Sequence, residues 1–145
     1  MLSNSKKYGI NGIPILGINL GNLGFLTDIQ TEDLELRLMD VLKGKYVLDE
    51  RPFLKAFLDS KELNSTALNE IVLHSGSVAK MIEYRLFINS SFVYSQKADG
   101  LIIFSPTGST AYSLSGGGPI VDPELNVIGI MPMFPHSINT TPIII

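Results

Sequence analysis

The sequence contains no cysteine and only two histidines among its 145 residues. The absence of cysteine excludes disulfide bonds and thiolate metal sites. The two histidines, His74 and His136, lie far apart in the sequence, and a histidine-based zinc site needs more ligands than two. We therefore expect no metal site built from cysteine or histidine side chains, and mainly structural roles for both histidines.

Positive charge is also scarce, with 11 Lys and Arg against 14 Asp and Glu and a net charge of −3. A chain without a basic surplus is not typical of a nucleic-acid-binding protein. No apolar run approaches the roughly 18 residues that span a bilayer. Residues 1–8 are polar and lack the apolar core of a signal peptide. We expect a cytoplasmic protein with no nucleic-acid or membrane partner.

The first third of the chain has the pattern of an α/β protein. Residues 13–18 form a continuous apolar run of strand length, which is typical of a strand buried on both faces. A glycine-rich turn follows at 19–24. Leucine and valine then recur at helical spacing over 34–42, with Thr31 as the predicted N-cap and Gly44 as the stop. Strand, loop and helix therefore follow one another.

From about residue 46 the apolar residues recur mostly with period two, which indicates β-strands. Residues 82–88 alternate, a turn follows at 89–91, and 92–97 form the returning strand of a hairpin. Further strands are predicted at 67–74, 100–104 and 127–131, and the chain ends in a run, 142–145, that resembles the start of another. We therefore predict an α/β plus β fold, divided into an α/β part at 1–48 and a β-rich part at 49–145.

The stretch 105–121, SPTGSTAYSLSGGGPIV, is rich in hydroxyl groups and glycine and follows the apolar run 101–104. This order predicts a strand that ends in a turn and enters a short helix. Free backbone N–H groups at a helix start attract anions, and the hydroxyl groups of Ser105, Thr107, Ser109 and Thr110 would add further donors. The glycines at 116–118 are expected to end the helix. The alternative interpretation is a Ser/Gly loop without a ligand.

Five other polar positions have both a functional and an ordinary interpretation. Asn69 and Glu70 interrupt an apolar strand and must be hydrogen-bonded or face a cleft, unless they are an exposed pair at its end. Asp99 precedes a glycine, which is common turn chemistry, but it also precedes the strand that leads into 105–121. Lys97, like Lys80, is either a solvated lysine or a partner for phosphate.

Ser109 lacks the nucleophile-elbow pattern of a catalytic serine, because the turn reads P-T-G-S-T and not G-x-S-x-G. Residue chemistry alone therefore predicts an α/β plus β protein with a loop suited to a phosphate or a nucleotide.

Four stretches resemble segments of the NAD kinases of bacteria, in the order in which that family carries them: GINLGNLGFLTDI (17–29), LNEIVLH (68–74), SQKADGLIIFSPTGSTAYSLSGGGPIV (95–121) and PMFPHS (132–137). The resemblance implies transfer of a phosphoryl group from ATP or polyphosphate to the 2′-hydroxyl of the adenosine ribose of NAD, with Mg²⁺ or another divalent metal. It also implies an α/β domain followed by a β-sandwich-like domain, with the active site between them. The family is commonly a homodimer or homotetramer in which neighbouring subunits help to complete the site.

The resemblance assigns the NAD-binding residues position by position. Asn69 and Glu70 match the family's Asn-Glu pair, and Asp99 matches an aspartate that contacts the dinucleotide. Lys80 and Lys97 fall where the family places contacting residues of variable type. The family's NAD-binding segment matches Thr110, Ala111, Tyr112, Ser113, Leu114 and Ser115.

One family motif is missing. The family's G-G-D-G motif carries the aspartate that deprotonates the 2′-hydroxyl, and this sequence contains no G-G-D-G. We therefore assign no catalytic residue. We expect a chain truncated at both ends, comprising the C-terminal part of the α/β domain and most of the β domain, and inactive by itself.

Two other functions are compatible with the residues. The first is a non-catalytic module that binds NAD or another nucleotide, or that serves assembly. The second is a lipid or sphingoid kinase of the same architecture, although the Asn-Glu and T-A-Y-S-L-S segments favour the NAD enzymes.

Overall fold

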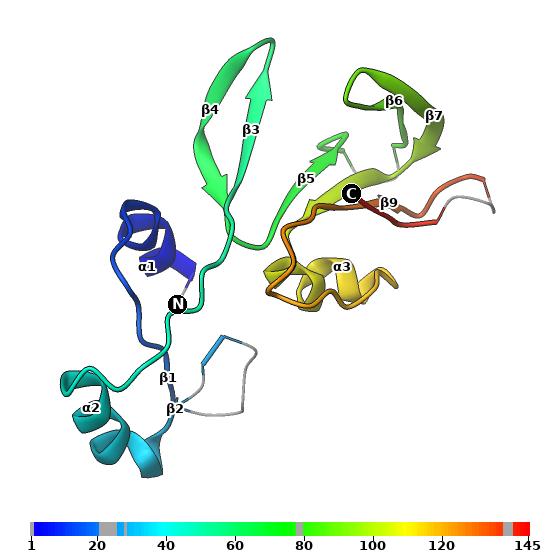
Figure 1. Ribbon diagram of the computed structural model, residues 1–145. Coiled ribbons are helices and arrows are strands. Elements are labelled where there is room, and N and C mark those ends of the chain that lie inside the picture. The colour runs from blue at the N-terminus through cyan, green and yellow to red at the C-terminus, as the bar shows by residue number, and fades with distance from the viewer. Residues whose placement is uncertain (1, 21–25, 28, 78–79, 138–140) are drawn as a thin grey trace. The chain divides into compact units, whose positions relative to one another are not determined.

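The computed structural model describes residues 2–20, 26–27, 29–77, 80–137 and 141–145 (Figure 1). The chain separates into two compact units, Met1–Glu50 and Arg51–Ile145. Most of the glycine-rich turn predicted at 19–24 lies outside the described residues.

The first unit contains short elements. They are α1 (Leu2–Lys7), a 3₁₀ turn η1 (Gly9–Asn11), β1 (Ile18–Asn19), β2 (Ile29–Gln30), a 3₁₀ turn η2 (Thr31–Asp33) and α2 (Leu34–Leu42). β1 and β2 pair in parallel, as the apolar run predicts, but the strand predicted at 13–18 is mostly wrong. Among the described residues, Ile18 is the one member of that run that is paired, opposite Ile29.

Helix α2 lies where the periodicity predicts it but begins only at Leu34, and Gly44 follows it with a left-handed φ of 77°. The predicted N-cap at Thr31 is wrong. Thr31 begins the 3₁₀ turn instead, and its hydroxyl donates a hydrogen bond to the carbonyl oxygen of Asn19 at 3.2 Å. The Thr31 hydroxyl therefore bonds to a distant carbonyl oxygen and does not cap a local backbone N–H group.

The second unit is built on a four-stranded antiparallel sheet of order β10-β9-β8-β5. Its strands are β5 (Glu70–His74), β8 (Gly100–Phe104), β9 (Gly129–Met133) and β10 (Ile143–Ile144). Two hairpins accompany it, β3 (Leu54–Leu58) with β4 (Lys61–Ala67) and β6 (Ile82–Ile88) with β7 (Ser91–Ala98). The predicted hairpin at 82–97 and the strands near 67–74, 100–104, 127–131 and 142–145 are confirmed, with shifted ends.

The core of the second unit lies on one face of β8 and β9. Its buried members are Ile102, Phe104, Val121 and Met131. Gly129 makes this packing possible, since a Cβ atom there would lie 2.0 Å from Cζ of Phe104. The core thus fixes β8, which leads directly into the 3₁₀ turn η3 (Thr107–Thr110) and the short helix α3 (Tyr112–Ser115).

The register of the sheet gives it two chemically different ends. Glu70 lies opposite Phe104, whereas His74 and Met133 both lie opposite Gly100. We call the first the turn end, because residues 105–115 follow it, and the second the hairpin end, because β7 leads into it. The five residues of β8 separate the two ends by about 14 Å. In Figure 1 α3 lies near one end of β9 and the β6–β7 hairpin near the other.

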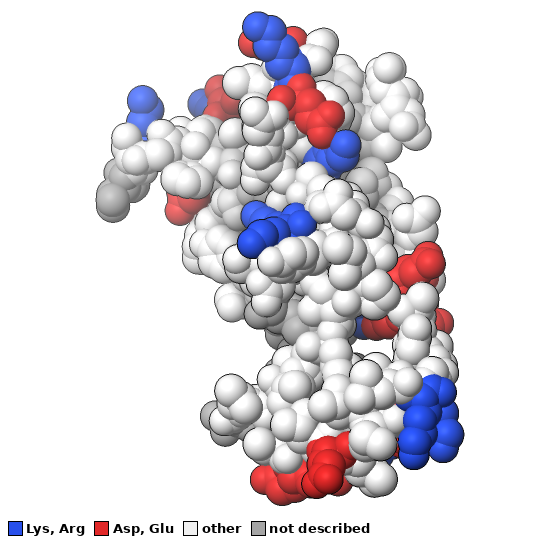
Figure 2. Space-filling view, turned by 90° about the vertical axis from the view of Figure 1, so that its left-hand side faces the viewer, with Lys and Arg blue, Asp and Glu red and all other residues white. Residues whose placement is uncertain are grey.

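The charged side chains do not gather into one patch on the face that Figure 2 shows, where acidic and basic groups are interspersed. Among the described residues, no helix is long and apolar enough to cross a membrane.

Candidate functional site

The turn end is fastened to the residues that precede β5. The backbone N–H group of Ser105 donates to the carbonyl oxygen of Asn69 at 2.8 Å, and its hydroxyl donates to the carbonyl of Leu68. The same hydroxyl accepts a bond from the N–H group of Gly108 at 3.1 Å. A Cβ atom at Gly108 would lie 2.1 Å from the carbonyl oxygen of Asn69, so only glycine allows this approach.

The hydroxyls of two further serines form hydrogen bonds within residues 105–121. Ser109 donates to the carbonyl of Pro106 at 2.6 Å and accepts from the N–H group of Val121 at 3.1 Å. Ser113 donates to the carbonyl of Gly108 at 3.0 Å. Both side chains are fully buried, as is that of Ser105. These hydroxyls hold the turn together, and the prediction that Ser105 and Ser109 offer donors to an anion is wrong.

The backbone amides of the turn are also largely occupied. The N–H groups of Gly108, Ser109 and Ala111 all bond within residues 105–108. A hydrogen bond from the N–H group of Tyr112 is directed to the Glu70 carboxyl group. These four residues therefore do not form the predicted cluster of free amides. Their N–H groups are directed to acceptors within residues 105–108 or to the Glu70 carboxyl group.

Asn69 and Glu70 provide the acceptor groups of the turn end. Both residues are half-buried rather than an exposed pair. Among the described residues, the buried atoms Oδ1 of Asn69 and Oε2 of Glu70 have no hydrogen-bond partner. Burial raises the pKa of Glu70, and the hydrogen bond from Tyr112 opposes this effect. Buried acceptors without donors are unfavourable, so the site is suited to a ligand that brings N–H or O–H groups.

The segment 110–115 divides into outward and inward side chains. Tyr112, Leu114 and Ser115 are exposed, whereas Ser113 is buried. Thr110 and Ala111 are half-buried, and the hydroxyl of Thr110 bonds back to the carbonyl of Thr107 at 3.3 Å. The exposed members could touch a ligand beside Glu70, and Ser113 can act only by positioning them.

A basic side chain that sequence reasoning missed also reaches the turn. Arg51 donates from Nη1 to the hydroxyl of Thr107 at 3.4 Å. The two residues are 56 positions apart, and no local pattern in the sequence indicates the contact.

Lys97 and Asp99 lie at the hairpin end, not beside Asn69 and Glu70. The N–H group of Asp99 donates to the carbonyl of Met133, and the N–H group of His136 donates to the carbonyl of Lys97, both at 2.9 Å. The side chains of Lys97 and Asp99 are exposed, as is Lys80. The structure thus divides the predicted NAD-binding residues between the two ends of the sheet.

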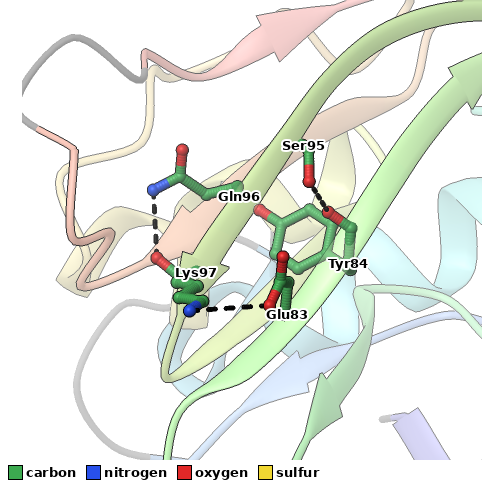
Figure 3. A network of polar contacts seen from close by, with 5 residues as sticks. All are labelled: Glu83, Tyr84, Ser95, Gln96 and Lys97. Carbon is green, nitrogen blue, oxygen red and sulfur yellow. Dashed lines mark hydrogen bonds and ion pairs between the residues drawn. The ribbon is translucent and has the colours of Figure 1, made fainter.

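The hairpin end is held by contacts between β6 and β7 (Figure 3). Between the strands, Lys97 Nζ lies 3.6 Å from Glu83 Oε2. Within β7, the side-chain amide of Gln96 donates to the Lys97 carbonyl at 3.0 Å. Tyr84 packs edge-to-face on Tyr94, with ring centroids 6.2 Å apart. Burial raises the pKa of both tyrosines.

A protein-held metal centre does not fit the part of the chain that the structure describes. In that part, no three His, Asp or Glu side chains are grouped so that they could hold an ion.

Two family models match the chain. The ATP-NAD kinase N-terminal domain matches residues 1–46, and the ATP-NAD kinase C-terminal domain matches residues 68–145. The chain is 48% identical over 148 residues to the NAD kinases of Teredinibacter turnerae and of Escherichia coli O7:K1, and 53% identical over 149 residues to that of Pseudoalteromonas translucida. All of this chain is covered, and it spans about half the length of these relatives, 50%, 51% and 50% respectively.

Two solved structures share the fold. Yeast NADH kinase complexed with NADH superposes with a TM-score of 0.82 at 34% identity, covering 91% of this chain and 40% of that one. An NAD kinase from Archaeoglobus fulgidus in complex with ATP superposes with a TM-score of 0.78 at 32% identity, covering 91% of this chain and 51% of that one. Motifs, family models and fold agree, and the chain belongs to the NAD kinase family.

Proposed function

We propose that this chain supplies the NAD-binding part of an NAD kinase, which transfers a phosphoryl group from ATP or polyphosphate to the 2′-hydroxyl of the adenosine ribose of NAD. The observation that carries the proposal is the pair of buried, unpartnered acceptors Asn69 Oδ1 and Glu70 Oε2 beside the turn 105–115. The adenosine half of NAD offers the hydroxyl and amino hydrogens that such acceptors need.

The contacts at the turn end support distinct roles for its residues. Asn69 and Glu70 accept hydrogen bonds from the dinucleotide, and the exposed ring of Tyr112 offers it an apolar face. Thr110, Ala111, Leu114 and Ser115 line the same segment. Ser113 positions it through its bond to the Gly108 carbonyl.

Lys80, Lys97 and Asp99 belong to the same function in this proposal, although Gly100, which follows Asp99, already lies about 14 Å from Glu70 along the sheet. We propose a homo-oligomer in which the hairpin end of one subunit completes the turn end of another. The exposed side chains of all three residues are compatible with that role.

Catalysis requires more than these residues provide. The sequence has no G-G-D-G and hence no counterpart of the family's base, so we propose that the 145-residue chain binds NAD without phosphorylating it. When Mg²⁺ is bound with ATP, it neutralises phosphate charge during transfer. The second candidate is a non-catalytic module that binds NAD. The missing G-G-D-G motif supports this candidate as much as it supports an inactive part of an NAD kinase.

The deciding experiment is a calorimetric titration of the purified chain with NAD. We expect saturable binding that Asn69→Ala weakens at least tenfold, because an acceptor–donor pair to the ligand is lost. Asn64→Ala, on the exposed face of β4, is the matched control and should bind like the unchanged chain. A folded chain, verified by circular dichroism, that binds no NAD would overturn the proposal.

A second assay tests the missing chemistry. The chain is incubated with NAD, Mg²⁺ and either ATP or polyphosphate, and NADP is measured by enzymatic cycling. We expect no NADP above the background of a chain-free reaction. NADP formation in proportion to the amount of chain would show that this polypeptide carries its own base.

A further inference from the structure

Phe134, in the segment PMFPHS, combines two unusual properties. Its backbone φ is 44°, in the left-handed region, and its side chain is 74% exposed. A bulky residue in this region is an outlier, and Pro135 adds a second restriction, because residues before proline prefer extended backbone. Neither packing nor backbone preference therefore explains a phenylalanine at this position.

The other non-glycine residues with positive φ in the described part of the chain have an ordinary explanation. Asp59 and Ser60 connect β3 to β4, and Asn89 and Ser90 connect β6 to β7. Two-residue hairpin turns of type I′ require positive φ at both positions, and short polar residues tolerate it. Phe134 lies in no hairpin of this kind. Strained backbone of this sort is typical of ligand clamps, where a particular side chain must be presented.

The contacts of the flanking residues place Phe134 at the hairpin end of the sheet. The Met133 carbonyl accepts from the N–H group of Asp99, and the N–H group of His136 donates to the Lys97 carbonyl. The two residues between them, Phe134 and Pro135, are thus held beside Lys97 and Asp99. The backbone of Phe134 is therefore held on both sides, in a segment hydrogen-bonded to the backbone of the two residues that carry a cation and a carboxylate.

We infer that Phe134 is a stacking platform for one of the two planar heteroaromatic rings of the dinucleotide, at the site to which Lys97 and Asp99 contribute. The inference rests on the proposed function and deepens it, since it adds a ligand contact at the hairpin end. A phenyl ring stacks on a base through its face, and the fixed backbone removes the cost of ordering it on binding. The adenine and nicotinamide rings share this chemistry, and the experiment distinguishes them.

The chain contains no tryptophan, so Phe134→Trp creates a single indole reporter. The indole is excited at a wavelength that tyrosine does not absorb. Its fluorescence should be quenched in a saturable manner as NAD is added. Nicotinamide mononucleotide and AMP, titrated separately, identify the ring that stacks. Phe57→Trp is the matched control, since Phe57 is also exposed but lies on β3. Quenching equal to that of Phe57→Trp would overturn the inference.

Phe134→Gly separates binding from folding. Glycine adopts positive φ without strain, so this variant should unfold at the same or a higher temperature than the unchanged chain. Loss of the ring should nevertheless weaken NAD binding by about five- to a hundredfold, the range of base–aromatic stacking. Asn89→Gly, which relieves a φ of 48° in a hairpin turn, should leave NAD affinity unchanged.

The outcomes distinguish this inference from the function on which it rests. If NAD binds, and Asn69→Ala weakens binding at least tenfold while Phe134→Gly does not weaken it, the proposed function stands and the platform is refuted. If the unchanged chain binds no NAD, both are refuted. Loss of affinity in Phe134→Gly with retained stability, together with quenching in Phe134→Trp, supports both.

Discussion

The two ends of β8 use polar residues in opposite ways. At the turn end the hydroxyls of Ser105, Ser109 and Ser113 are buried and bonded to backbone groups. At the hairpin end Lys97 and Asp99 keep their side chains exposed, and their backbone groups hydrogen-bond to His136 and Met133. The first end is a rigid frame that holds a few acceptors, and the second presents its functional groups outward.

This difference predicts where substitutions are costly. Changes at the turn end should affect folding and NAD binding together, because the same contacts support both. Changes at the hairpin end should affect binding or association with little effect on stability, because surface groups contribute little to it.

The largest effect is expected for Gly108→Ala. An added methyl group would lie 2.1 Å from the Asn69 carbonyl oxygen, so the turn must separate from the strand. We expect a loss of about 3 kcal/mol or more in the free energy of unfolding, measured by urea denaturation, and loss of NAD binding.

Gly117→Ala is the control for Gly108→Ala. A methyl group there meets no atom within 4 Å, although φ is 86°. Its cost should be only about 1 kcal/mol, from backbone strain. Equal costs for the two substitutions would show that the close approach of Gly108 to Asn69 is not formed in solution.

Ser109→Ala should have the next largest effect. The substitution leaves the N–H group of Val121 without its acceptor in a buried site. We expect a loss of about 1–3 kcal/mol in the free energy of unfolding. Ser115→Ala, which removes an exposed hydroxyl from the same segment, should change it by less than about 0.5 kcal/mol. A Ser109→Ala chain as stable as Ser115→Ala would refute the framing role of this serine.

Glu70 should make the stability depend on pH. Burial raises its pKa above the ordinary value of 4.5, so the folded chain binds its proton more readily than the unfolded chain does. The stability that this raised pKa contributes should therefore be fully present below about pH 4.5 and should be lost as the pH rises through the folded pKa.

Glu70→Gln should flatten this dependence. The test is the melting temperature as a function of pH for Glu70→Gln and for Glu124→Gln, an exposed control. If the two variants show the same pH profile as the unchanged chain, Glu70 does not titrate with a raised pKa.

The parts of the fold that sequence patterns predicted are those set by local periodicity. Residues 82–88 alternate because one face of the hairpin packs inward, and α2 keeps a helical period. The continuous apolar run 100–104 predicted a buried strand, and its residues are buried apart from the half-buried Ile103. In each case the signal lies within the element itself.

The parts that escaped prediction depend on distant partners. Thr31 has the residue type of an N-cap but bonds to Asn19, and the contact of Arg51 with Thr107 spans 56 positions. For the site, the motifs identified the residues but not their separation. The distance between Glu70 and Asp99 depends on the register of β5 with β8, which no motif states.

The smallest effect is expected for Glu83→Gln, which removes the partner of Lys97 at the hairpin end. Both side chains are largely exposed and their charged atoms are 3.6 Å apart, so the free energy of unfolding should change by less than about 1 kcal/mol. Without Glu83, the Lys97 ammonium group is free to approach a phosphate, and NAD should bind slightly more tightly at low salt. Because screening weakens both effects, the difference should vanish at high ionic strength. A large loss of stability in Glu83→Gln would mean that the hairpin end is also a folded frame, and the contrast between the two ends would not hold.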